Sequence, residues 1–182
     1  MNEFTDSELL EKFRNADTSD YAFNLIVQKY QKLLYWNIRR MVLKHEDADD
    51  ITQNVFIKVW RNLHQFREDA LLSTWIYRIG INETNSFIKK QKLKYFVRFS
   101  DYEEHLINSL KDDSFFSGNQ TEHILQKALL KLPPKQKQVF NMRYYEEMPY
   151  EEISDILGTS VGALKASYHL AAKKIEKFIN GN

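Results

Sequence analysis

Apolar residues recur at helical spacing along almost the whole chain, and this periodicity limits its fold more than any other feature. Between residues 23 and 42 they stand three or four positions apart, the pattern of one apolar helix face: Phe23, Ile26, Val27, Tyr30, Leu34, Ile38, Met41 and Val42. Five Gly and three Pro among 182 residues are too few for a β fold rich in turns. The sequence therefore predicts an all-α protein.

Residues with capping preferences predict where the helices of the first half begin and end. Asp47 is expected to cap a helix with its apolar face running as far as Phe66. Ser73 or Thr74 is expected to cap the next helix, and the basic segment 89–94 suits its C-terminus, where cations meet the negative end of the helix dipole.

The second half is expected to hold four shorter helices. The first should cover residues 121–132, with Thr121 as its cap. Pro134 fits the first turn of the next helix, because proline needs no amide donor there. A short helix over 151–157 and a last helix over 161–179 follow.

Charge divides the chain into segments although its net charge is only +1. Residues 21–95 hold thirteen basic and seven acidic side chains, and residues 121–182 hold nine and seven. Residues 96–120 lie between them, with an acidic excess and no sustained period. We interpret 1–95 and 121–182 as two small helical domains joined by a linker over 96–120. The basic excess suggests a polyanionic partner, although a solvated helix surface would also explain it.

Several protein classes are not expected. The chain has no Cys, so it lacks disulfides and thiolate zinc sites, and a reducing, cytoplasmic location is compatible with it. An acidic N-terminus without a long apolar run does not resemble a signal peptide, and no segment is apolar enough to insert into a membrane. The five His form no metal-binding spacing, and no nucleophile elbow or phosphate loop is present. We expect no catalytic residue, no metal, no cofactor and no enzymatic activity.

The segment "LGTSVGALKASYHLAAKKI" has the pattern of a helix-turn-helix. Gly158 is expected in the left-handed conformation that ends a helix, and Thr159 or Ser160 is expected to cap the next one. In such units the second helix enters the DNA major groove. Apolar residues would join the two helices: Ile153, Leu157, Val161, Leu164 and Tyr168. A plain helical hairpin that binds nothing is the alternative.

Two long blocks resemble the extracytoplasmic-function group of sigma-70-type RNA polymerase sigma factors. "LPPKQKQVFNMRYYEEMPYEEISDILGTSVGALKASYHLAAKKI" resembles the domain that reads the minus-thirty-five promoter element. "DADDITQNVFIKVWRNLHQF" resembles the helix that binds core polymerase, and "FREDALLSTWIYRIGINETNSFIKKQK" resembles the loop and helix for the minus-ten element. The resemblance implies an alternative sigma factor that binds bacterial RNA polymerase core and promoter DNA, and that is held by an anti-sigma factor.

The resemblance also implies three sets of site residues. The core-binding candidates are Asp50, Gln53, Asn54 and Ile57. The minus-ten candidates are Phe66, Arg67, Trp75, Arg78, Asn82, Lys89 and Lys90. The minus-thirty-five candidates are Arg143, Ser160, Ala163, Lys165, Ala166, His169 and Lys173.

Some positions depart from the family pattern. Asn54 replaces a frequent glutamate, Ile81 a frequent arginine, and three recognition-helix positions lack the arginines of many relatives: Ser167, Leu170 and Ala172. Fewer cations release fewer counterions from DNA, so weak binding to isolated promoters is expected. Two alternatives stay open: a dimeric helix-turn-helix transcriptional regulator without polymerase docking, and a helical adaptor that binds only proteins.

Overall fold

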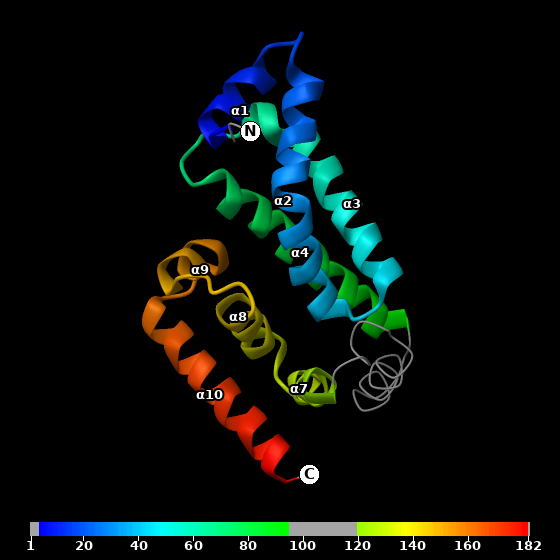
Figure 1. The fold of residues 1–182 in the computed structure, drawn as a ribbon, viewed down its shortest axis with the longest axis vertical. Coiled ribbons are helices and arrows are strands. Elements are labelled where there is room, and N and C mark those ends of the chain that lie inside the picture. The colour runs from blue at the N-terminus through cyan, green and yellow to red at the C-terminus, as the bar shows by residue number, and fades with distance from the viewer. Residues whose placement is uncertain (1–3, 95–119, 182) are drawn as a thin grey trace.

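The computed structural model describes residues 4–94 and 120–181, and within these ranges the regular elements are all helices. The first range forms α1 (Asp6–Arg14), α2 (Ser19–Val42), α3 (His45–Asn62), the short 3₁₀ helix η1 (Leu63–Gln65) and α4 (Leu72–Lys94). The second forms α7 (Gln120–Leu130), α8 (Pro134–Tyr144), α9 (Tyr150–Leu157) and α10 (Val161–Asn180). Figure 1 shows the first group in the upper part of the molecule and α10 along the lower edge. The predicted all-α class is confirmed.

Helix α1 is not among the helices expected from the sequence, although its start has a clear signal. The backbone N–H of Thr5 donates to the Glu8 carboxylate at 2.7 Å, and the Glu8 N–H donates to the Thr5 hydroxyl at 3.3 Å. This reciprocal capping box satisfies two amide groups that the first turn leaves without partners. Leu9 and Phe13 then bury one face of the helix.

Two of the predicted helix starts are wrong. Helix α3 begins at His45, so Asp47 lies inside its first turn instead of preceding it. Helix α4 begins at Leu72, which places Ser73 and Thr74 within the helix. Leu72 is only 2% exposed, and its burial in the core favours a helix that starts before the hydroxyl residues.

Helix α7 also differs from the prediction at both ends. It begins at Gln120, so Thr121 is a helical residue and not a cap, and it ends at Leu130, before the expected Leu132. The predicted linker 96–120 lies outside the described residues except for Gln120, which already belongs to α7. Helix α8 begins at Pro134, as predicted.

Helix α2 is the centre of the first helical group. Ile26, Leu34 and Ile38 are at most 1% exposed and lie in a core with residues of α1, α3 and α4. A Cβ atom at Gly80 of α4 would lie 2.6 Å from Leu34 Cδ1, which is too close for an ordinary contact. The missing side chain therefore lets α4 cross α2 closely.

The second helical group packs around α8 and α10. Ala128, Leu129, Phe140 and Ile175 belong to one core, formed by α7, α8 and α10. A separate cluster joins α8, α9 and α10, and it also contains Tyr77 and Ile81 of α4: Tyr77, Ile81, Val139, Met142, Met148, Ile153, Ile156 and Leu164. One helix of the first group thus completes a core of the second.

Lys137 is a buried cation where α8 meets α2. Its side chain is 6% exposed, and Nζ donates to the backbone carbonyl of Met41 at 3.3 Å. Burial, with the charge of Lys92 as a second cause, lowers the pKa of Lys137 to about 7. An ammonium group in this position loses water and gains one neutral acceptor, so its charged form destabilises the packed state.

Lys137→Met should reduce the pH dependence of stability. The unfolded chain keeps this lysine protonated up to its ordinary value of 10.5, whereas the packed chain releases the proton near 7. The unfolded state therefore binds more protons between pH 7 and 9, and stability rises with pH in that window. Thermal unfolding should show the wild-type melting temperature rising by a few degrees more than that of Lys137→Met.

Lys135→Met is the matched control for this prediction, because Lys135 is exposed on the same helix and the charge change is identical. It should keep the wild-type pH dependence. Equal pH responses of Lys137→Met and the wild type would show that the Lys137 charge is not desolvated.

Candidate nucleic-acid interface

The turn between α9 and α10 has the geometry expected from its sequence. Gly158 has φ 59° and ψ 36°, and its N–H donates to the Ser154 carbonyl at 2.9 Å. The Ser160 hydroxyl accepts from the Ala163 N–H at 3.4 Å, so Ser160 and not Thr159 caps α10. The left-handed glycine ends one helix and the serine starts the next within three residues.

Helix α10 is buried along one stripe and exposed along the rest of its surface. Leu164, Ala171 and Ile175 are its buried residues, and Ile153 and Ile156 of α9 pack in the same cluster as Leu164. The six predicted recognition residues on this helix and its cap are all exposed: Ser160, Ala163, Lys165, Ala166, His169 and Lys173. The structure therefore brings these six together on a surface that DNA could reach.

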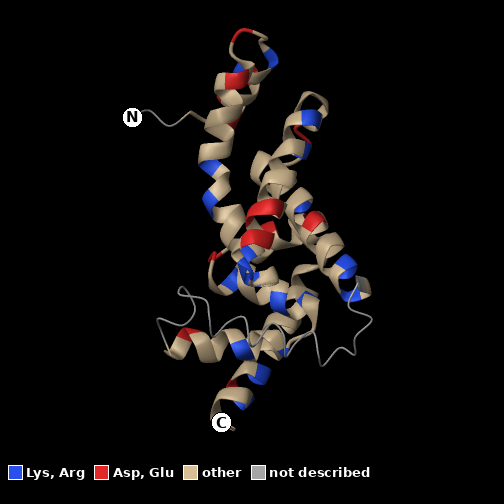
Figure 2. Cartoon of the chain, turned by 90° about the vertical axis from the view of Figure 1, so that its right-hand side faces the viewer, with Lys and Arg blue, Asp and Glu red and all other residues tan. Residues whose placement is uncertain are grey.

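Basic side chains continue along α10 towards its C-terminus, as Figure 2 shows in blue near the C label. Lys173 and Lys177 are exposed, and Lys174 donates to the Gln136 side chain of α8 at 3.0 Å. Lysines on one exposed helix suit contacts to phosphate, which position a protein on DNA without reading its sequence.

Gly158→Ala should destabilise the helix-turn-helix. No atom lies within 4 Å of a Cβ built at Gly158, so the cost comes from the positive φ alone, roughly 1–2 kcal/mol. Gly162→Ala is the matched control: its Cβ also meets nothing, and Gly162 lies inside α10, where Ala favours the helix. Chemical denaturation should show reduced stability only for Gly158→Ala, and equal effects at both positions would contradict the argument.

Arg143 has a structural role that the sequence analysis misses. Its Nη1 donates to the carbonyls of Glu147 and Met148, both at 3.1 Å, and the guanidinium lies 5.2 Å from the Tyr150 ring centroid. These contacts hold the turn between α8 and α9, where Glu147 has a φ of 52°. The predicted phosphate contact of Arg143 would have to be made by a group that already has these partners.

The predicted core-binding residues lie together on an exposed surface of α3. Asp50, Gln53, Asn54 and Ile57 are all exposed, and the Ile57 side chain is 47% exposed. A groove of about 720 Å³ runs beside them between α2 and α3, and Gln53 and Ile57 help to line it. Aromatic residues line the rest of this groove, namely Phe23, Phe56 and Trp60. Trp60 stands three residues after Ile57, a helical spacing that could have indicated it.

The loop before α4 holds the first minus-ten candidates. Phe66 is only 9% exposed, and its ring lies 5.0 Å from that of Trp75, so both rings pack in the first core. Arg67 is exposed and pairs with Asp69 at 3.0 Å. Of these candidates, Arg67 is the side chain available at the surface, while Phe66 and Trp75 support the loop from beneath.

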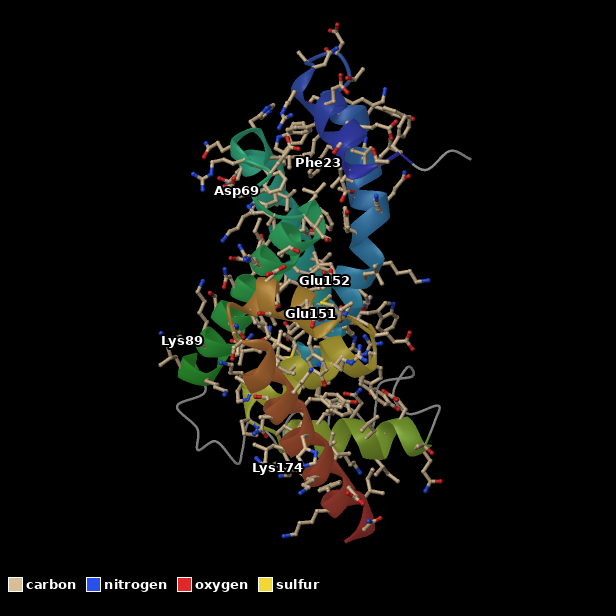
Figure 3. The ribbon with its side chains drawn as sticks, turned by 90° about the vertical axis from the view of Figure 1, so that its left-hand side faces the viewer. Phe23, Asp69, Lys89, Glu151, Glu152 and Lys174 are labelled. Carbon is tan, nitrogen blue, oxygen red and sulfur yellow. The ribbon has the colours of Figure 1, made fainter. Side chains whose placement is uncertain are left out.

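The remaining minus-ten candidates divide along α4. Lys89 and Lys90 are exposed near its C-terminus, and Figure 3 shows Lys89 projecting away from the molecule. Arg78 instead donates from Nε to the backbone carbonyl of Asp155 in α9 at 2.9 Å, and Nη2 makes a second bond to the same oxygen. Asn82 lines a cleft of about 560 Å³ between α4, α8 and the end of α9. These two residues therefore face the second helical group.

The described part of the chain offers no cluster of three or more His, Cys, Asp or Glu that could hold a metal ion. Within the same residues, no helix combines the length and apolar character needed to cross a bilayer.

Comparison with known proteins agrees with this arrangement of surfaces. Residues 26–94 match the family model described as Sigma-70 region 2, and residues 122–175 match Sigma-70, region 4. The chain is 28% identical to the ECF RNA polymerase sigma-E factor of Haemophilus influenzae, over 97% of this chain and 96% of that protein. The chain therefore belongs to the sigma-70 family of RNA polymerase sigma factors, in its extracytoplasmic-function (ECF) group.

Two solved structures have the same fold. CnrH, solved in complex with the cytosolic domain of CnrY, has a TM-score of 0.68 and 22% identity, over 96% of each chain. The sigma factor RpoE of Bartonella quintana, solved in complex with the anti-sigma factor NepR, has a TM-score of 0.67 and 18% identity. That match covers 87% of this chain and 96% of RpoE.

Proposed function

We propose that this chain is an alternative sigma factor that binds RNA polymerase core and directs transcription initiation to particular promoters. The exposed surface of α10, opposite its single buried stripe, supports this most directly, because a helix-turn-helix needs such a surface to enter the major groove. Sigma factors are DNA-binding regulators, and we propose no catalytic activity for the chain itself. It would act in the cytoplasm, beside polymerase.

We propose that the two regions divide the work. Residues 1–95 would bind polymerase core and the minus-ten element, residues 96–120 would link the regions, and residues 121–182 would bind the minus-thirty-five element. The matched ranges 26–94 and 122–175 support this division. Arg67, Lys89 and Lys90 are the exposed cations available for a separated DNA strand. The strand contacts of Arg78 and Asn82 would require α9 to move.

A helix-turn-helix regulator without polymerase docking is the second candidate. It would need the α9–α10 unit but would have no use for the exposed α3 surface formed by Asp50, Gln53, Asn54 and Ile57. The match of residues 26–94 to region 2 favours the sigma factor over this candidate. Purified chain, core enzyme and a promoter pool separate the two, because only a sigma factor produces transcripts that depend on adding the chain.

Lys165→Glu should weaken recognition of the minus-thirty-five element. Lys165 is exposed near the start of α10, with Nζ 5.7 Å from the Tyr150 ring centroid, so a phosphate could approach it. Charge reversal replaces attraction by repulsion and should reduce promoter affinity about tenfold without affecting core binding. Holoenzyme binding to duplex promoter DNA measures the first effect, and competition for core measures the second.

Lys177→Glu is the matched control, since Lys177 is an exposed lysine at the far end of the same helix. It should retain most of the promoter affinity. If both variants weaken DNA binding equally, the recognition surface is not where we place it.

Asp50→Arg should have the opposite profile. Asp50 is exposed at the start of the α3 surface, and a reversed charge there should weaken core binding about tenfold, as for charge pairs at protein interfaces. Competition with another sigma factor for limiting core measures this loss. Glu11→Arg, an identical charge change on exposed α1, should compete like the wild type. A normal Asp50→Arg competitor would remove this surface from the core interface.

We propose that an anti-sigma factor regulates the chain, because the similar RpoE was solved in complex with the anti-sigma factor NepR. The groove between α2 and α3 and the cleft beside α4 are the two recesses that such a partner could enter.

A further inference from the structure

The second helical group is docked on the first through a mixed apolar and polar contact. Tyr77 and Ile81 of α4 are 5% and 7% exposed, and they share a cluster with Ile153 and Ile156 of α9. Figure 3 places Glu151 and Glu152 of α9 in the middle of the molecule, where the two groups meet. The contact covers a part of α4 that holds two of the minus-ten candidates.

Glu146, in the turn after α8, is the main polar group of this contact. One carboxylate oxygen accepts from the Asn37 side chain of α2 at 2.6 Å, and the other accepts from the Tyr77 hydroxyl at 2.9 Å. Arg40 lies 4.1 Å from the Tyr145 ring centroid and supplies positive charge near the carboxylate. Burial raises the pKa of Glu146, whereas these donors and Arg40 favour its charged form.

The C-terminal end of α9 occupies Arg78. Both guanidinium bonds go to the backbone carbonyl of Asp155, which lies in the last turn of the helix. Carbonyl groups at a helix C-terminus have no partner within the helix and carry partial negative charge. The carbonyl thus takes a position that a DNA phosphate oxygen would take on an unoccupied Arg78.

We propose that, in the chain without polymerase, its own C-terminal region docks on α2 and α4 through Glu146 and competes with a single DNA strand for α4. This inference rests on the proposed function, because it concerns the surface assigned to the minus-ten strand. A chain that is mostly docked shows only the fraction of its strand affinity that corresponds to its open population. Docking would therefore keep the free chain from occupying single-stranded DNA before it joins polymerase.

Glu146→Ala should open this contact selectively. In the docked state, the substitution leaves Asn37, Tyr77 and Arg40 without their carboxylate, and partly buried donors without an acceptor are costly. In the open state, water solvates the same groups, so the substitution has little effect there. Glu147→Ala is the matched control, because Glu147 is the adjacent glutamate and is exposed.

Distance measurements test the docking itself. The chain has no native cysteine, so spin labels can be placed on Ser86→Cys in α4 and Lys177→Cys in α10, both exposed positions. Pulsed electron spin resonance should give one narrow distance distribution for the labelled wild type and for Glu147→Ala. Glu146→Ala should broaden it towards longer distances. A broad wild-type distribution, or a narrow one in Glu146→Ala, would overturn the proposal.

Strand binding tests the competition. Fluorescein-labelled random-sequence 12-nucleotide DNA strands should bind Glu146→Ala about tenfold more tightly than the wild type or Glu147→Ala, in proportion to the open fraction. Equal affinities in a variant that the spin labels show to be open would refute competition for α4. Asn37→Ala removes the donor on the α2 side and should behave like Glu146→Ala, so it decides the matter if Glu146→Ala fails to fold.

The proposed function can fail separately. Absence of promoter-dependent transcription with core enzyme would refute the sigma-factor assignment, whatever the spin-label result. A narrow distribution in the open variants would refute the docking, whatever the transcription result.

Discussion

The structure depends on helix α4 being apolar on two faces. Leu72 and Ile76 belong to the core of the first helical group, while Tyr77 and Ile81 belong to the cluster that also contains α8 and α9 residues. Adjacent residues such as Ile76 and Tyr77 point about 100° apart on a helix, so a single helix can serve two cores. Burial of both faces brings the two helical groups together, and the intervening sequence need not hold them in place (Figure 1).

The functional surfaces follow from what this packing leaves exposed. Helices α3 and α10 each bury one stripe, so a continuous polar or mixed surface remains on each for a partner. Helix α4 has less to spare, because its two buried faces leave Arg78 and Asn82 against the second group. The surfaces on α3 and α10 are accessible in the docked chain, whereas part of the α4 surface is not.

The sequence predicted those features that depend on neighbouring residues. Gly158 and Ser160 form the turn before α10 because a left-handed glycine and a hydroxyl cap act within one turn of the chain. Periodicity placed the six exposed recognition residues correctly for the same reason. The capping box of α1 is equally local, and the T-x-x-E pattern at Thr5 to Glu8 could have revealed that helix. The starts of α3 and α4 were misplaced because core packing, and not the capping preference, decided them.

By itself, the sequence determined an all-α chain, its helix-turn-helix and the set of side chains offered to partners, since helical periodicity and capping act over a few residues. Only the tertiary structure decided the roles of groups whose partners are far away in the chain. Arg143 holds a turn, Phe66 lies in a core, and Lys137 and Glu146 are desolvated against α2. Desolvation and long-range hydrogen bonds arise when distant segments pack together, and no local pattern of residues encodes which segments will meet.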